Sequence, residues 1–249
     1  MNYGLCNLSI VPLRAEASDT SEMVSQVLYG ETFKVLEIRK KWSRIRLSFD
    51  TYEGWIDNKQ YLILSEEDFN NLEGQSNKLS THLVDIITTS ENELFSICLG
   101  SNLNALSYLE HKCEGLSISG VQPKSELIET AQLYLNSPYL WGGKTPFGID
   151  CSGFTQMVYK LNGYQLLRDA SLQATQGDSL SFIEESEPGD LAFFDNAEGI
   201  ITHVGIIMED NYIIHAHGKV RVDRLDHSGI FNYEKRTHTH KLRVIKRIV

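Results

Sequence analysis

One cysteine stands out because it lies between a loop broken by glycine and proline and a helical pattern. Residues 139–153 read Tyr-Leu-Trp-Gly-Gly-Lys-Thr-Pro-Phe-Gly-Ile-Asp-Cys-Ser-Gly. Apolar residues then recur at helical spacing: Phe154, Met157, Val158 and Leu161. The pattern predicts an amphipathic helix that begins after Asp150 as its N-cap and ends near Gly163, with Cys151 in its first turn.

The thiol of Cys151 is a nucleophile only after it loses its proton. The free backbone N–H groups of a helix N-terminus stabilise negative charge and therefore favour the thiolate. The neighbouring carboxylate of Asp150 acts in the opposite direction, so nucleophilic chemistry here requires a separate base. Without one, a lone cysteine in a helix is most simply a small buried apolar residue.

Three short runs further along the chain have the composition of β-strands: 190–195, 202–208 and 212–216. The last two are separated by residues 209–211, which are few enough for a hairpin. A three-residue loop pairs Gly205 with His215 and places His203 on the same face as His215. A two-residue turn would put the two imidazoles on opposite faces.

A cysteine, a histidine base and a third polar group that orients the base form the general arrangement of thiol catalysis. Cys151, His203 and His215 supply these three groups. We therefore predict a cysteine nucleophile that acts without a metal or another cofactor.

A zinc site is the alternative use of the same residues. His203, His215 and His217 can be drawn around a metal together with the thiol, and His238 and His240 add further imidazoles. This alternative leaves the broken loop before the cysteine unexplained. We interpret His238 and His240 as solvated residues of a connecting segment.

The segment 139–153 resembles the active-site segment of the NlpC family of bacterial cell-wall cysteine peptidases. Three later runs resemble the remaining blocks of that family in order and spacing: 188–191, 203–206 and 214–216. The resemblance covers residues 121–249. It implies a circularly permuted papain-like domain, in which the helix that bears the cysteine packs on an antiparallel sheet that bears the histidines.

The resemblance also implies roles for single residues. Cys151 corresponds to the nucleophile, His203 to the general base and His215 to the orienting group. Tyr139 corresponds to a tyrosine proposed to stabilise the oxyanion, although a core aromatic is an equally good interpretation. His217 departs from the family, which usually carries a small residue at this position.

The N-terminal part of the chain has a different pattern. Strand-like runs separated by turns occupy residues 23–28, 32–38, 42–47 and 52–56. About five short strands in ~60 residues suggest a small barrel. The successive elements Gly-Glu, Trp-Ser-x-Ile and Glu-Gly-Trp-Ile resemble a bacterial SH3-like domain.

The predicted fold is therefore α+β, with an SH3-like β-barrel in front and a papain-like peptidase behind. We predict an SH3-like domain at 1–64, a linker with a possible second, degenerate SH3-like unit at 65–120, and the peptidase at 121–249. A surface helix or linker is expected at 65–74, strands at 82–88, 94–99 and 116–119, and a helix capped by Ser125 at 124–136.

The combination of the two domains resembles a narrower group, the γ-D-glutamyl–diamino acid endopeptidases, or dipeptidyl-peptidase VI. It implies that the SH3-like domain covers one end of the groove and that murein peptides with a free N-terminal L-alanine are hydrolysed after D-glutamate. Tyr52 and Asp150 correspond to residues that hold the α-ammonium group, with Glu16 as a further acidic contact. Ser152 and Ser171 correspond to contacts of the D-glutamate.

Simpler interpretations of these residues remain. Asp150 is also explained as a helix cap alone, Tyr52 as a rim aromatic, and Arg168 with Asp169 as a surface pair. Two other functions also remain: a broader D,L-endopeptidase, amidase or acyltransferase on the same scaffold, or a non-catalytic peptide-binding protein.

Composition agrees with an enzyme of more than one domain. The chain has 249 residues, of which 41% are hydrophobic and 22% charged, and a formal net charge of −10. This charge argues against nucleic-acid partners and against passive binding to anionic membranes. The first residues show no basic stretch followed by an apolar core, so we expect a cytoplasmic protein, or a periplasmic one if a leader was trimmed. The sequence leaves the oligomeric state and the preferred diamino acid open.

Overall fold

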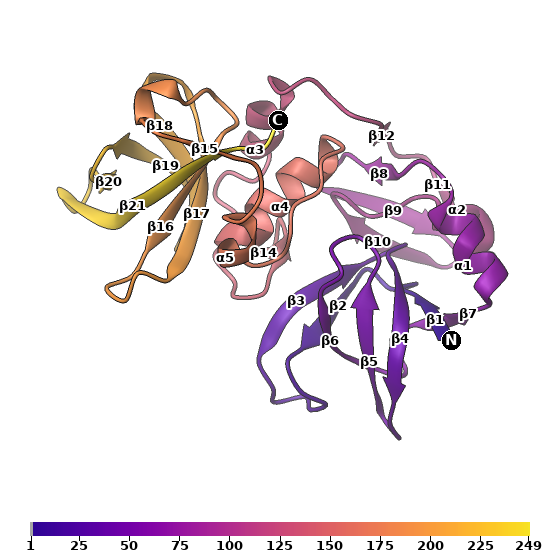
Figure 1. The fold of residues 1–249 in the computed structure, drawn as a ribbon. Coiled ribbons are helices and arrows are strands. Elements are labelled where there is room, and N and C mark those ends of the chain that lie inside the picture. The colour runs from indigo at the N-terminus through magenta and orange to yellow at the C-terminus, as the bar shows by residue number, and fades with distance from the viewer. Residues whose placement is uncertain (1) are drawn as a thin grey trace. The chain divides into compact units, whose positions relative to one another are not determined.

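The computed structural model describes residues 2–249, which divide into two compact units (Figure 1). The first unit comprises the chain up to Val121 together with Trp141–Pro146. The second comprises Gln122–Leu140 and Phe147–Val249. No helix in residues 2–249 is both long and apolar enough to cross a membrane.

The first unit is built around a seven-stranded sheet with the order β3-β2-β6-β5-β4-β1-β7. Its strands are β1 (Asn2–Leu5), β2 (Ile10–Arg14), β3 (Met23–Leu28), β4 (Thr32–Ile38), β5 (Trp42–Leu47), β6 (Glu53–Asp57) and β7 (Leu62–Leu64). The four predicted strands are confirmed as β3 to β6. Strands β1, β2 and β7 were not predicted; Pro12 within β2 is a residue that normally argues against a strand.

Alternation of buried and exposed residues explains the core of this sheet. In β5, Ser43, Ile45 and Leu47 are buried while the arginines between them are exposed. The buried side chains pack with residues of the neighbouring strands, among them Val11, Leu13, Val27, Phe33 and Ile56. The strand periodicity of two therefore places one face of each strand in the core.

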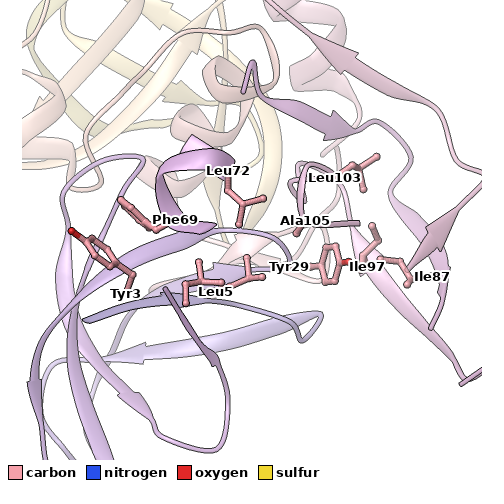
Figure 2. Close-up of a cluster of buried hydrophobic side chains, with 10 residues drawn as sticks. Tyr3, Leu5, Tyr29, Phe69, Leu72, Ile87, Ile97, Leu103 and Ala105 are labelled. Carbon is pink, nitrogen blue, oxygen red and sulfur yellow. The ribbon is translucent and has the colours of Figure 1, made fainter. Parts of the chain in front are cut away.

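A second cluster of buried side chains joins β1 to several of the remaining elements of the first unit, as Figure 2 shows. The remaining elements are α1 (Glu66–Glu73), β8 (Lys78–Ser80), β9 (Val84–Thr88), β10 (Leu94–Cys98), α2 (Ala105–Tyr108), β11 (Lys112–Cys113), β12 (Ser117–Ser119) and β13 (Lys144–Thr145). Phe69 of α1 stacks on Tyr3 with ring centroids 4.2 Å apart, and Ile87 and Ile97 join the same cluster beside Tyr29.

Of the two expectations for 65–74, a surface helix or a linker, the structure has the helix, α1, and the Ser65 side chain accepts a hydrogen bond from the backbone N–H of Asp68 at 3.0 Å. The three strands predicted further along occur as β9, β10 and β12. Strands β10, β9 and β11 form one small sheet, and β12 and β8 form another. The domain limits 1–64, 65–120 and 121–249 and a second SH3-like unit stay predictions.

The second unit contains helices on an antiparallel sheet. Its elements are α3 (Glu126–Gln132), β14 (Gly148–Ile149), α4 (Cys151–Leu161), α5 (Ala170–Gln173), β15 (Asp178–Leu180), η1 (Ile183–Glu185), β16 (Leu191–Asp195), β17 (Ile201–Ile207), η2 (Glu209–Asn211), β18 (Tyr212–His217), β19 (Lys219–Asp226), β20 (Gly229–Asn232) and β21 (Thr237–Arg247). The sheet order is β15-β21-β16-β17-β18-β19-β20, and β20 also pairs with β21, so strands β16 to β21 close on themselves. The predicted α+β class is confirmed.

The register of the β17–β18 hairpin is the one predicted from its loop length. Gly205 pairs with His215, and the loop between the strands is the single turn η2. Asp210 and Asn211 adopt φ values of 55° and 59°, a left-handed conformation that short polar side chains tolerate. His203 and His215 therefore lie on one face of the hairpin.

The helix predicted at 124–136 is shorter in the structure and is not capped as expected. Helix α3 covers Glu126–Gln132, and Ser125 has a helical backbone and no capping hydrogen bond from its side chain. The capping role predicted for Ser125 is therefore wrong, because a cap requires an extended backbone at this position. Helix α3 is tied to α4 by a hydrogen bond of 3.0 Å from Asn162 Nδ2 to Thr130 Oγ1.

Candidate active site

Helix α4 presents Cys151 at its N-terminus, as the sequence predicts. Asp150 has the extended backbone of an N-cap, with φ −91° and ψ 176°, and its Oδ1 accepts a hydrogen bond of 2.7 Å from the backbone N–H of Gly153. The helix ends at Leu161 with Gly163 at φ 82° just beyond it. Cys151 is buried, with 6% of its surface exposed.

Part of the loop that precedes this helix in the sequence belongs to the first unit. The segment Trp141–Pro146 belongs to that unit, and the backbone N–H of Lys144 donates to Gln26 Oε1 at 2.7 Å. Gly142 has φ 76°, and a Cβ there would lie 2.3 Å from the carbonyl oxygen of Met23. Only glycine therefore fits at this close approach, which accounts for one of the glycines that break the loop.

Arg168 is a buried partner of Asp150, and the interpretation of Arg168 and Asp169 as a surface pair is wrong. The guanidinium is 1% exposed, and its Nη1 and Nη2 donate to Asp150 Oδ1 and Oδ2 at 3.0 and 2.6 Å. Nη1 also donates to Ser152 Oγ at 2.9 Å. This two-pronged pairing offsets the charge of the carboxylate beside the thiol.

The predicted D-glutamate contacts lie on two helices that share a buried link. Ser152 is buried in α4, whereas Ser171 lies on the exposed side of α5. Gln173 joins the two helices, because its Nε2 donates to the Ser152 carbonyl oxygen at 3.0 Å and its Oε1 accepts from Thr155 Oγ1 at 2.7 Å. Gln173 was not predicted, since nothing in the sequence of α5 alone indicates a contact with α4.

The two histidines of the hairpin are in direct contact. His203 Nε2 lies 2.8 Å from His215 Nδ1, and both imidazoles are buried. Helix α4 packs on β17 and β18, the strands that bear them. The Cys151 thiol lies 3.9 Å from the carbonyl oxygen of Thr202, the residue that precedes His203. The structure thus brings the predicted nucleophile, base and orienting group together on neighbouring elements.

Two charged residues of β19 extend this group and were missed by sequence analysis. His215 Nε2 lies 3.1 Å from Asp223 Oδ2, and Arg221 Nη2 donates to Asp223 Oδ1 at 3.0 Å. Strand β19 pairs with β18 so that Arg221 is opposite His215 and Asp223 is opposite Ile213. Residues two apart on one strand share a face, so Arg221 and Asp223 lie on the same face of β19. Gly218 forms the turn between β18 and β19. Recognising this turn in the sequence would have given the register of the two strands and so the positions of both residues.

The interpretation of His240 as a solvated residue is also wrong. His240 lies in β21, and its imidazole stacks on that of His203 with centroids 4.2 Å apart and planes at 23°. Phe194 packs against both rings. His217, the residue that departs from the family, has its ring edge-on to His240 at 4.8 Å. By contrast, His238 pairs with Asp226 at a largely open position.

Burial sets the protonation of the thiol and the base in the free protein. It raises the pKa of the Cys151 thiol to about 12, and the Asp150 carboxylate adds to this rise, while the backbone N–H of Val204 and the guanidinium of Arg168 oppose it. Burial, with the neighbouring histidines, lowers the pKa of His203 well below its usual range. At neutral pH the resting pair is therefore a thiol and a neutral imidazole.

This resting state predicts how alkylation of Cys151 depends on pH. At pH 7 roughly one molecule in 10⁵ carries the thiolate if the thiol pKa is about 12. We expect the rate of modification by iodoacetamide to rise about tenfold per pH unit between pH 7 and 10. Mass spectrometry of the peptide that contains Cys151 measures this rate. A rate that reaches a plateau with a midpoint below pH 7 would contradict a neutral resting pair.

Tyr139 lies beside the thiol and is not a core aromatic, because 36% of its surface is exposed. Its backbone is placed by a bridge to Ile149 and by a hydrogen bond of 3.0 Å to the Gly218 carbonyl oxygen. Burial of its hydroxyl, with the charges of Cys151 and Asp150, raises the pKa of Tyr139. The hydroxyl therefore keeps its proton at neutral pH and can donate a hydrogen bond.

The predicted ammonium-binding residues outside α4 lie in the first unit. Tyr52 is half-buried at the edge of the core of the seven-stranded sheet. Glu16 is exposed in the turn after β2, where its backbone N–H donates to Ser21 Oγ at 2.9 Å. Their role toward a substrate bound at Cys151 stays a prediction.

The histidines form no recognisable metal centre. Within residues 2–249, no three or more His, Cys, Asp or Glu side chains are arranged to hold a metal ion. Instead, nitrogen atoms of His203 and His215 are engaged with each other and with Asp223. Chemically, a thiol on an element that packs against two hydrogen-bonded imidazoles can serve acyl transfer, with the thiol as nucleophile and an imidazole as base.

Two family models match the chain. Residues 136–240 match the NlpC/P60 family, and residues 13–60 match the bacterial dipeptidyl-peptidase Sh3 domain. The first range contains the thiol and the four clustered histidines, and the second contains Glu16 and Tyr52. The two matches therefore include all nine residues predicted from the sequence to form the site.

Individual relatives agree with these models. Dipeptidyl-peptidase 6 of Lysinibacillus sphaericus is 28% identical over 86% of this chain and 88% of its own length. The γ-D-glutamyl-L-lysine dipeptidyl-peptidase of Bacillus subtilis is 40% identical over 36% of this chain, and the alignment spans only 31% of that protein. The crystal structure of an NlpC/P60 family protein from Bacillus cereus has the same fold, with a TM-score of 0.80, 19% identity and 99% of each chain covered.

Proposed function

Because the chain belongs to the NlpC/P60 family and carries a bacterial SH3 domain of the dipeptidyl-peptidase type, we propose that it is a cysteine dipeptidyl-peptidase acting on murein peptides. The bond hydrolysed joins the γ-carboxyl of D-glutamate to the following diamino acid. The observation that carries the proposal is the buried thiol at the head of α4 beside the hydrogen-bonded pair of His203 and His215.

We propose the following reaction at these groups. The Cys151 sulfur attacks the γ-carbonyl carbon while His203 takes the thiol proton, which gives a tetrahedral oxyanion. The protonated Tyr139 hydroxyl donates to that oxyanion. His203 then gives its proton to the departing amine of the diamino acid, which leaves the L-Ala-γ-D-Glu group as a thioester on Cys151. A water molecule, deprotonated by His203, hydrolyses the thioester and restores the thiol.

We propose that the free N-terminus of the peptide is the main determinant of specificity. An ammonium group that leaves water requires compensating acceptors, and Asp150, Tyr52 and Glu16 have the chemistry to provide them. Ser152 and Ser171 are assigned to the D-glutamate part of the peptide. The names of the Bacillus relatives specify L-lysine as the diamino acid, so a lysine peptide is the first substrate to test.

The proposal is tested by product analysis. We expect the protein to convert L-Ala-γ-D-Glu-L-Lys into L-Ala-γ-D-Glu and free lysine, with both products identified by mass spectrometry. A matched peptide with an α-linked D-glutamate serves as the control for the bond and should stay intact. Release of free alanine, or no cleavage of either the lysine peptide or its diaminopimelate counterpart, would contradict the proposed reaction.

A further inference from the structure

His203, His215 and Asp223 form one chain of hydrogen bonds across three strands. His203 Nε2 lies 2.8 Å from His215 Nδ1, and His215 Nε2 lies 3.1 Å from Asp223 Oδ2. A neutral imidazole has one N–H and one acceptor nitrogen. The direction of the hydrogen bond at one end of the chain therefore determines every other direction along it.

Asp223 is placed to set that direction. Its side chain is 3% exposed, and Arg221 Nη2 donates to its Oδ1 at 3.0 Å. Burial alone would raise the pKa of this carboxyl, but the hydrogen bonds from His215 and Arg221 outweigh burial and hold the pKa below its usual range. The side chain is thus an ionised carboxylate, which accepts hydrogen bonds and donates none.

The tautomers follow from this acceptor. His215 must donate from Nε2 to Asp223, so His215 Nδ1 carries no proton and accepts from His203. His203 must then carry its proton on Nε2, which leaves Nδ1 as its basic nitrogen. That is the nitrogen not engaged by His215, and it is the one that can take a proton from the thiol of Cys151.

We propose that Asp223 is a positioning residue that fixes the tautomers of His215 and His203 and so keeps the base ready to accept the thiol proton. This inference rests on the proposed roles of Cys151 and His203. Arg221 assists by holding the carboxylate in place, because its Nη2 donates to Oδ1 at 3.0 Å and its Nε lies 2.8 Å from Oδ2, the oxygen that accepts from His215. The motif resemblance gave no role to any residue that follows His215 in this series of hydrogen bonds.

The surrounding groups keep both imidazoles neutral, which is the state in which tautomers matter. Burial is the main cause that lowers the pKa values of His203 and His215. His215, His240 and His217 further lower the pKa of His203. Asp223 opposes the lowering of the His215 pKa, whereas His217 and Arg221 add to it. Cys151 begins α4, which packs on the strands of both histidines, and burial raises the pKa of its thiol to about 12.

The substitution Asp223→Asn tests the proposal because it should reverse the direction of each hydrogen bond from residue 223 to His203. Arg221 can only donate, and its hydrogen bond goes from Nη2 to Oδ1, whereas its Nε lies 2.8 Å from Oδ2 without making a hydrogen bond. We therefore expect the amide oxygen to take the Oδ1 position and the amide NH₂ to take the Oδ2 position beside His215 Nε2. His215 then carries its proton on Nδ1, and His203 carries its proton on Nδ1 toward the thiol. We expect kcat to fall by about 10²- to 10⁴-fold, by comparison with the same change beside a catalytic histidine in other enzymes, with KM changed by less than about threefold.

The matched control is Asp226→Asn. Asp226 lies on the same strand and also pairs with a histidine Nε2, that of His238 at 2.8 Å, but at an exposed position outside the site. We expect kcat and KM of this variant to equal those of the unmodified protein.

Nitrogen-15 NMR of the imidazoles separates the inference from the proposed activity. In the unmodified protein at pH 7 we expect Nε2–H on both His203 and His215, and in Asp223→Asn we expect Nδ1–H on both. Nδ1–H on His203 in the unmodified protein would overturn the inference even if Asp223→Asn does not fold. Unchanged tautomers and kcat within threefold in the variant would also overturn it. If the peptide is not cleaved at all, the proposed function fails, while the NMR result still decides the role of Asp223.

Discussion

Replacing Cys151 by alanine is expected to lower kcat/KM for the lysine peptide by roughly 10⁴-fold or more, because it removes the atom that forms the thioester. Groups that act as one catalytic unit show effects that do not add. The double substitution Cys151→Ala with His203→Ala should therefore be no slower than Cys151→Ala alone. Initial rates measured by chromatographic separation of the products provide the comparison.

A cysteine outside the site supplies the control for this result. Cys113 is a free, half-buried thiol in the first unit, and Cys113→Ala should keep the kcat/KM of the unmodified protein. A Cys151→Ala variant that keeps its fold and retains more than a tenth of the activity would contradict the mechanism, as would a double variant that is much slower than the single one.

Acetylation of the substrate's N-terminus is expected to lower kcat/KM by about 10⁴-fold, because polar groups built to hold an ammonium would be left without partners. The measurement compares L-Ala-γ-D-Glu-L-Lys with its N-acetyl form under the same conditions. In Tyr52→Phe the difference should shrink mainly through slower cleavage of the free peptide. Cleavage of both peptides within tenfold of each other would instead support the broader D,L-endopeptidase.

Local patterns in the sequence were sufficient for the centre of the site. The apolar spacing after Cys151 predicted α4, and the length of the loop at 209–211 predicted the pairing of Gly205 with His215. Both features depend on residues close in the chain, where helix periodicity and hairpin geometry act directly. The same is true of Asp150 as the N-cap, since capping involves residues only three apart.

Contacts between distant segments were not predictable in the same way. His240 reaches His203 only because β21 closes the barrel beside β16, and Arg168 reaches Asp150 because the segment before α5 returns to the head of α4. Because His240 and Arg168 lie in polar stretches of the sequence, each looks like an exposed residue when only its neighbours in the chain are considered. Asp223 lies between these cases, because recognition of the turn at Gly218 would have placed it diagonally across from His215.

The most direct test of the account is whether the acyl group of the substrate becomes attached to Cys151. The unmodified protein would be mixed with L-Ala-γ-D-Glu-L-Lys, quenched in acid within the first turnover and digested for mass spectrometry. The account predicts that the peptide containing Cys151 gains the mass of one L-Ala-γ-D-Glu acyl group, and that hydroxylamine removes it. Lysine released at full rate by protein whose Cys151 never carries this group, together with full activity of Cys151→Ala, would contradict the account.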